Sequence, residues 1–247
     1  MNRHLRSLRL TEIDRALKLA SPWLTEHASI LEIGAGCGHQ AAELHRRGFR
    51  VTAIDVTPCK PPDTSEFSVE LYDGKHIPLT DHSVDIIFSS NTLEHIAEIS
   101  EFLIELRKVL AEGGIAIHIV PSATWRFWTT LAHFPYLLFS LIRTVLPDTS
   151  KPVRTASAQN HRGVRLFRAL FPHHHGEHGN LITEHFSFRR QTWEALFNKT
   201  GWTILQYDHN HLFYTGYSLL EEYMPIDLRS RIAALIGGSC HIFILKP

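Results

Sequence analysis

Two hydrophobic patterns alternate along the first half of the chain. Short runs of consecutive apolar residues are typical of buried parallel strands, and apolar residues spaced three and four apart are typical of helices that cover a sheet. The strand pattern occurs at residues 29–34, 50–56, 66–73, 83–90 and 115–121. The helix pattern occurs at residues 11–20, with Thr11 as a candidate cap, and at 39–48 and 99–114, which both end in glycine. This order predicts a doubly wound α/β sheet with crossover helices.

The alternation stops at Ser122 and resumes at residue 188. The resumed pattern predicts a helix at 188–202, a sixth strand at 203–208, a helix-like stretch at 218–238 and a seventh strand at 240–246. We therefore predict one domain, residues 1–247, with a seven-stranded and mostly parallel sheet. Residues 122–185 form a helix and loop insertion after the fifth strand. Because ligands of open α/β sheets bind at the carboxyl ends of the strands, this insertion is predicted to cap the substrate site.

The insertion has an unusual composition. Residues 125–146 contain thirteen large apolar residues in twenty-two, and residues 151–170 contain five basic residues and no acidic residue. The apolar run is long enough to span a bilayer, but its two arginines, His133 and Pro135 oppose a spanning helix. A helical cap over an apolar pocket is favoured, and the alternative is peripheral contact of 125–168 with the inner face of a membrane. Both interpretations favour an acceptor with an apolar part, such as a lipid-linked sugar or an isoprenoid.

Charge and cysteine content limit the class of protein. Lys plus Arg and Asp plus Glu both number 25 in 247 residues, so no basic surplus indicates DNA binding. Only the arginines of the insertion leave a structured RNA as a possible substrate. Cys37, Cys59 and Cys240 show no CxxC spacing and are predicted to be reduced thiols. Charged residues interrupt any apolar core near the N-terminus, so a secretory signal is not predicted. These features predict a cytoplasmic protein.

A glycine-rich turn follows the first predicted strand. Glu32, Gly34, Gly36 and Gly38 follow the pattern acid-x-Gly-x-Gly-x-Gly between a strand and a helix. Glycines at such a turn allow a ligand to approach backbone amides at a helix N-terminus. Asp55 ends the second strand, where a carboxylate can accept hydrogen bonds from two ribose hydroxyls. These features suit both NAD and S-adenosylmethionine. The alternative is a tight strand-to-helix turn that binds no ligand.

Four ordered segments carry a resemblance to a known family. They are EIGAGCG (32–38), AIDV (53–56), YDGKHIPLTDHSVDIIFSSNTLEHI (72–96) and LRKVLAEGGIAIHIVP (106–121). Together they resemble the class I S-adenosylmethionine-dependent methyltransferases, whose fold is a Rossmann-like seven-stranded sheet. The resemblance implies S-adenosyl-L-methionine as cofactor and S-adenosyl-L-homocysteine as product. Cys37 and His39, which flank Gly38, depart from the family pattern.

The resemblance implies that eight residues bind the cofactor: Glu32, Gly34, Gly36, Gly38, Asp55, Asp73, Gly74 and Asn91. It implies that Glu32 lies near the methionine amino group and that the three glycines line the methionine end. Asp55 is expected at the ribose hydroxyls and Asp73, with Gly74 beside it, at the adenine amino group. Asn91 is expected to face the cofactor from the substrate side. Asp73-Gly74 is also a common turn pair, so a purely structural role stays open.

Histidines supply the candidate bases for a hydroxyl acceptor. His95, in the Leu-Glu-His segment, lies just past the fourth strand, and Glu94 before it could be a solvated residue of a first helical turn. Residues 171–185 contain five histidines, for which a metal site, a surface loop and a substrate pocket are the alternatives. Pro172 and two glycines oppose the helix that a metal site would need, so no metal is predicted. The favoured interpretation is a lid. It has candidate catalytic His178 and His185 and candidate substrate-binding Glu177 and Glu184.

These observations predict a methyltransferase that uses S-adenosylmethionine to methylate a small or lipid-linked acceptor, with a hydroxyl as the favoured target. One alternative is an NAD-dependent oxidoreductase, which would share the glycine turn and Asp55 but leave Asp73 and the Leu-Glu-His segment unexplained. The other is a non-catalytic methyltransferase-like binding protein that docks partners on its insertion. No feature of the chain predicts the oligomeric state.

Overall fold

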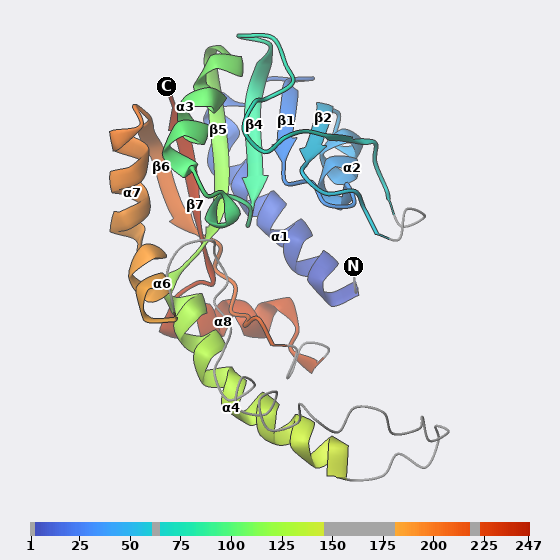
Figure 1. Cartoon of the computed structure of the whole chain (residues 1–247), viewed down its shortest axis with the longest axis vertical. Coiled ribbons are helices and arrows are strands. Elements are labelled where there is room, and N and C mark those ends of the chain that lie inside the picture. The colour runs from blue at the N-terminus through green and yellow to red at the C-terminus, as the bar shows by residue number, and fades with distance from the viewer. Residues whose placement is uncertain (1–2, 61–64, 146–180, 218–222) are drawn as a thin grey trace.

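A single mixed sheet organises the molecule (Figure 1). The computed structural model describes residues 3–60, 65–145, 181–217 and 223–247. The sheet has seven strands in the order β3-β2-β1-β4-β5-β7-β6. They are β1 (Ser29–Ile33), β2 (Arg50–Asp55), β3 (Val69–Leu71), β4 (Val84–Ser90), β5 (Leu110–Pro121), β6 (Thr203–His209) and β7 (Cys240–Lys246). The first five strands are parallel to one another, and β7 runs antiparallel to both β5 and β6. The predicted fold class is confirmed.

Helices cover both faces of the sheet. Their bounds are α1 (Arg3–Ala20), η1 (Ser21–Trp23), α2 (His39–Arg46), η3 (Leu93–His95), α3 (Ile99–Val109), α4 (Ala123–Val145), α6 (Leu181–Ser187), α7 (Arg190–Lys199) and α8 (Ile226–Ile236). α1 contacts α2 on one face of the sheet, and α3 and α7 cover the other. The apolar strands β1, β4, β5 and β7 form the centre of the buried core between these layers. The carboxyl ends of β4 and β5 point toward the region of α4 and α8 (Figure 1).

Some element bounds differ from the sequence prediction. α1 begins at Arg3, so Thr11 lies inside the helix and donates to the Ser7 carbonyl oxygen at 2.9 Å instead of capping the N-terminus. α3 ends at Val109, five residues before the predicted end. The ladder pairs Val84 with Leu110 and then Ile86 with Ile115, so residues 111–114 form a bulge at the start of β5. Gly113 and Gly114 therefore turn the chain within β5, beyond the end of α3.

The insertion follows β5 without a break. α4 runs from Ala123 to Val145 and includes Pro135. Residues 146–180 lie outside the described residues, and the chain re-enters with α6. The 23-residue α4 projects from the carboxyl edge of the sheet (Figure 1). Within the described ranges, no helix combines the length and the hydrophobicity that crossing a bilayer needs.

The prediction of three reduced cysteines is wrong. Cys37 and Cys59 form a disulfide, whereas Cys240 is a buried thiol at the start of β7. The two bonded residues are 22 apart in sequence, but the parallel pairing of β1 with β2 brings the loops that follow these strands together. Spacing along the chain could not reveal this contact, because it depends on which strands are neighbours.

Candidate functional site

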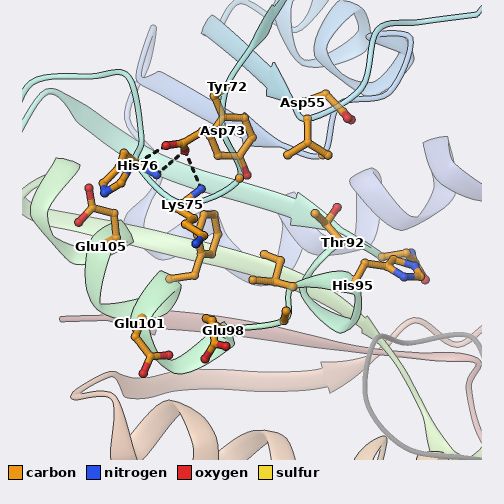
Figure 2. A pocket seen from close by; sticks show the side chains of 17 residues that line it. Asp55, Tyr72, Asp73, Lys75, His76, Thr92, His95, Glu98, Glu101 and Glu105 are labelled. Atoms are coloured by element: carbon orange, nitrogen blue, oxygen red, sulfur yellow. Dashed lines mark hydrogen bonds and ion pairs between the residues drawn. The ribbon is translucent and has the colours of Figure 1, made fainter.

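A cavity of about 640 Å³ opens at the carboxyl ends of β1, β2 and β4. Six of the predicted site residues line it, and they come from four separate segments of the chain. These residues are Gly34, Asp55, Asp73, Gly74, Asn91 and His95. Figure 2 shows Asp55, Tyr72 and Asp73 on one side of the cavity, with Glu98, which precedes α3, and Glu101 of α3 opposite them. The sheet topology thus assembles five of the eight predicted cofactor residues, together with His95, at one site.

The glycine turn leaves backbone exposed where a side chain would block it. Gly34 has φ +72°, and a Cβ atom there would lie 2.3 Å from Thr92 Oγ1. Gly36 has φ +57°, and no atom lies within 4 Å of the position that its Cβ would occupy. Glycine adopts these left-handed conformations without the penalty that other residues incur. The turn is therefore compact beside Gly34 and open to a ligand beside Gly36.

Asp55 connects the glycine turn to the end of β2. Its Oδ2 accepts the Gly36 N–H at 2.7 Å, and its Oδ1 accepts the Thr57 N–H at 2.9 Å. The residue is 8% exposed at the edge of the cavity. The Thr57 hydroxyl also donates to Oδ1 at 3.1 Å, so one of the roughly four lone-pair sites of the ionised carboxylate stays available to a ligand hydroxyl. Asp55 both orders the turn and presents an acceptor to the cavity.

Glu32 is a buried carboxyl group beside this turn. It is 2% exposed, and its Oε2 atom has no hydrogen-bond partner among the described residues. Burial, together with the nearby negative charge of Asp55, raises the pKa of Glu32 to about 8. A buried acceptor of this kind is stabilised when a cationic donor binds next to it. The site therefore fits a ligand that carries an ammonium group, as the amino end of S-adenosylmethionine does.

Asp73 caps a tight turn at the opposite end of the cavity. Its carboxylate accepts the N–H groups of Lys75 and His76 at 2.8 and 2.7 Å, and its Oδ2 lies 2.7 Å from His76 Nδ1 (Figure 2). The bonds from His76 hold the pKa of Asp73 well below its usual range. The structural role of Asp73 in the turn is therefore confirmed, and its contact with adenine stays a prediction.

Apolar side chains that the sequence analysis missed form much of the cavity wall. Val56 follows Asp55 directly and is 56% exposed, while Tyr72, Ile96 and Phe102 line other parts of the surface. The signal that the sequence contained is the position of Val56, which directly follows the acidic residue at the carboxyl end of β2. Such walls suit the flat apolar faces of an aromatic ring system.

A methyltransferase-domain family model matches residues 1–207. The chain belongs to the methyltransferase-domain family. This result confirms the predicted resemblance to the S-adenosylmethionine-dependent methyltransferases.

Curated relatives match less than half of the chain. The malonyl-[acyl-carrier protein] O-methyltransferase of Geobacter sulfurreducens is 30% identical over 112 residues, which are 42% of this chain and 42% of that protein. The ubiquinone biosynthesis O-methyltransferase of Caulobacter vibrioides is 29% identical over 120 residues, 45% of this chain and 47% of that protein. The chain thus matches less than half of the length of these relatives.

Solved structures support the fold over nearly the whole chain. An S-adenosylmethionine-dependent methyltransferase from Mesorhizobium loti superposes with a TM-score of 0.55 at 15% identity, covering 96% of this chain and 98% of that one. A Burkholderia thailandensis 1,6-didemethyltoxoflavin-N1-methyltransferase, solved with S-adenosylhomocysteine, gives a TM-score of 0.52 at 13% identity over 95% and 77% of the two chains. At these identities the likeness shows the fold alone.

The methyltransferase domain places one predicted base in the cavity. His95 lines the cavity with a side chain that is 42% exposed, and its Nε2 lies 3.9 Å from Oε1 of Glu94. The expectation that Glu94 is solvated is wrong, because its side chain is buried. Burial raises the pKa of Glu94 to about 8. The 3₁₀ turn η3 thus presents the histidine to the cavity and directs the preceding carboxyl inward.

The two described residues of the predicted lid, Glu184 and His185, do not line this cavity. His185 and Glu184 belong to helix α6, so the expectation of an open loop at these positions is wrong. Glu184 is fully buried, and its Oε2 lies 3.0 Å from Arg126 Nε, which leaves no surface for a substrate contact. Glu177 and His178 lie outside the described residues. A separate group of potential metal ligands, Asp208, His209 and His211, lies at the end of β6, where the three donor atoms are within 4.8 Å of one another.

Proposed function

We propose that this domain binds S-adenosylmethionine in the 640 Å³ cavity and transfers its methyl group to an oxygen of a small or lipid-linked acceptor, releasing S-adenosylhomocysteine. The observation that carries this proposal is the convergence of four predicted residues on one cavity. Gly34, Asp55 and Asn91 lie at the ends of β1, β2 and β4, and Asp73 lies between β3 and β4. The matching methyltransferase family supports the same activity.

In this proposal, different residues bind different parts of the cofactor. Glu32 accepts from the amino group, Asp55 accepts from the ribose hydroxyls, and the spare lone pair of Asp73 accepts from the adenine amino group. Val56 and Ile96 supply apolar surface for the adenine ring. The bound cofactor supplies a methyl group that is already activated on a sulfonium. The protein therefore contributes mainly alignment of the acceptor, an effect worth about 7–11 kcal/mol of barrier in well-oriented reactions.

An oxygen acceptor is favoured by two observations. The two curated relatives described above are both named O-methyltransferases. His95 also presents an imidazole to the cavity, where a neutral ring can accept the proton of a hydroxyl as the methyl group is transferred. Such a base contributes about 10² to 10⁴ in rate. We assign this role to His95 in preference to His185, because His185 does not line the cavity.

Two measurements test the proposal against its alternatives. Isothermal titration with S-adenosylhomocysteine and with NADH distinguishes the methyltransferase from the oxidoreductase, which the family match disfavours. Transfer of labelled methyl from S-adenosylmethionine into a fractionated host extract then distinguishes an enzyme from a binding protein. Label in the organic phase would identify a lipid-linked acceptor, and label in the aqueous phase a soluble one. Cofactor binding without any labelled product would favour the non-catalytic alternative.

A further inference from the structure

The outer face of α4 is a continuous apolar stripe. Phe127, Leu131, Phe134 and Leu138 are 52%, 49%, 55% and 61% exposed. Their spacing of four, three and four residues places them within an arc of about 60° on the helix. The opposite face contacts α6 and buries Trp125, Thr129 and His133. No part of the chain that the structure describes covers this stripe. Apolar residues scattered singly over a surface would not align in this way.

The stripe continues into an apolar pocket. Leu131 belongs to both, and the pocket of about 260 Å³ lies between α4 and the chain that leads into α8. Trp128 and Pro135 line it from α4, and Phe213 and Met224 line it from the other side. Trp128 packs edge-on against Phe213 with ring centroids 5.9 Å apart. An apolar chain that entered along the stripe would thus find a preformed slot beside it.

A short series of contacts links this slot to the proposed cofactor cavity. Tyr214 lines the slot, and its hydroxyl lies 3.0 Å from Sγ of Cys240. The Cys240 thiol donates to Asn91 Oδ1 at 3.5 Å, and Asn91 lines the cofactor cavity. The Tyr214 hydroxyl also donates to the buried Glu12 carboxylate at 2.7 Å, which fixes its position. The apolar slot and the cofactor cavity are therefore separated by a few buried polar side chains.

Charge favours an anionic membrane over a second copy of the chain as the partner of the apolar stripe on α4. Residues 123–145 contain no acidic residue, and one of their two arginines, Arg126, is buried against Glu184. The sequence that follows is basic, since residues 151–170 contain five basic residues and no acidic residue in a chain of zero formal net charge. An exposed apolar stripe on a helix that a basic stretch of sequence follows suits the interface of an anionic bilayer. A second copy of the chain would bring two such basic regions together, which like-charge repulsion opposes.

We infer that the stripe of α4 inserts into the interface of an anionic membrane and that the adjoining slot holds one hydrocarbon chain of a membrane lipid. With this geometry, α4 lies along the membrane surface and does not cross it. The part of the inference that makes this lipid the methyl acceptor rests on the proposed function. The membrane contact and the slot stand on the stripe, the pocket and the charge alone.

Flotation with vesicles tests the membrane contact without any methyl transfer. Vesicles of phosphatidylglycerol and phosphatidylcholine should carry the wild-type chain upward, and Leu131→Glu and Phe134→Glu should each lower the partition coefficient by about ten-fold or more. Ile104→Glu is the matched control, because Ile104 is 48% exposed on α3, far from α4 (Figure 1), and should leave flotation unchanged. Absence of wild-type flotation, or equal flotation of the stripe variants, would overturn the inference.

Tryptophan quenching tests the slot. Phospholipids brominated on their acyl chains should quench a fluorescence component that Trp128→Phe removes, since Trp128 lines the slot. Ala132→Phe should fill the slot and reduce this quenching while flotation persists. Quenching that Ala132→Phe leaves unchanged would overturn the slot. A dimer in solution that Leu131→Glu dissociates, without flotation, would replace the lipid by a second copy. Titration with S-adenosylhomocysteine, run separately, shows whether the proposed function fails independently.

Discussion

Arg126 Nε lies 3.0 Å from Glu184 Oε2, and both side chains are almost completely buried. Arg126 belongs to the first turn of α4 and Glu184 to α6, which are the described parts of the insertion on either side of residues 146–180. The pair therefore fastens the base of α4 against α6 at the carboxyl edge of the sheet. This contact also explains why Glu184 is unavailable for the substrate role predicted from its sequence position.

Loss of one member of this pair should be costly. Glu184→Gln leaves the buried Arg126 charge without its counter-ion and should lower the free energy of unfolding by about 3–5 kcal/mol. The double variant Arg126→Met/Glu184→Leu should recover most of that loss, because it removes both charges. The exposed pair Arg190–Glu194 is the matched control, and Glu194→Gln should cost about 1 kcal/mol or less. Urea unfolding measures all three, and equal effects at the two pairs would contradict a buried-charge role.

Asp55 should be indispensable for cofactor binding. Asp55→Ala removes the acceptor at the ribose and the bond that orders Gly36, so affinity for S-adenosylhomocysteine should fall at least about 100-fold. Thr57→Val removes only the hydroxyl that lies 3.1 Å from Asp55 Oδ1 and should change affinity by a few-fold at most. Isothermal titration calorimetry provides both values. Unchanged affinity in Asp55→Ala would remove this residue from the site.

Stability and cofactor affinity should depend on pH in opposite directions. Burial raises the pKa of Glu32 from 4.5 to about 8, so the folded protein binds more protons than the unfolded chain between these values. Stability of the cofactor-free protein should therefore fall as pH rises from about 5 to 8, and Glu94 contributes in the same direction. Affinity for S-adenosylhomocysteine should rise over the same range, because ionised Glu32 accepts from the amino group. Glu32→Gln should flatten the affinity profile, and a pH-dependence that persists in this variant would assign it elsewhere.

The Cys37–Cys59 disulfide should stabilise the glycine turn. Its residues are 22 apart, and closing a loop of that size contributes about 3 kcal/mol in the chain-entropy model. Treatment with dithiothreitol, or Cys37→Ser/Cys59→Ser, should lower the melting temperature and weaken S-adenosylhomocysteine binding, since Cys37 lies between Gly36 and Gly38. Cys240→Ser is the control for loss of a thiol outside the turn. Equal melting curves before and after reduction would show that the bond does not constrain the folded protein.

His95 should act on turnover and leave cofactor binding intact. His95→Ala should lower kcat by about 10² to 10⁴ for a hydroxyl acceptor, with unchanged affinity for S-adenosylhomocysteine. His185→Ala, on α6, serves as the matched comparison. Wild-type turnover in His95→Ala would transfer the role of base to another group, with His178 as the next candidate.

Much of the fold followed from local pattern. The apolar runs of β1, β4 and β5 and the glycines at 34, 36 and 38 are short-range features, so periodicity and turn chemistry were enough to predict the strands and the turn. The order of acid and glycine motifs also predicted six residues that the structure brings to one cavity. Element bounds were less accurate where strand pairing overrode the local signal, as at Val109 and the bulge that follows it.

By itself, the sequence determined the class of sheet, the family and the residues at the carboxyl ends of its strands, because these depend on neighbours along the chain. Only the tertiary structure decided contacts between distant segments. It joined Cys37 to Cys59, buried Glu94, and paired Glu184 with Arg126 instead of exposing it to substrate. The physical reason is that burial and counter-charge depend on which elements pack together. A polar residue has the same appearance in a sequence whether it faces a ligand, water or a buried partner.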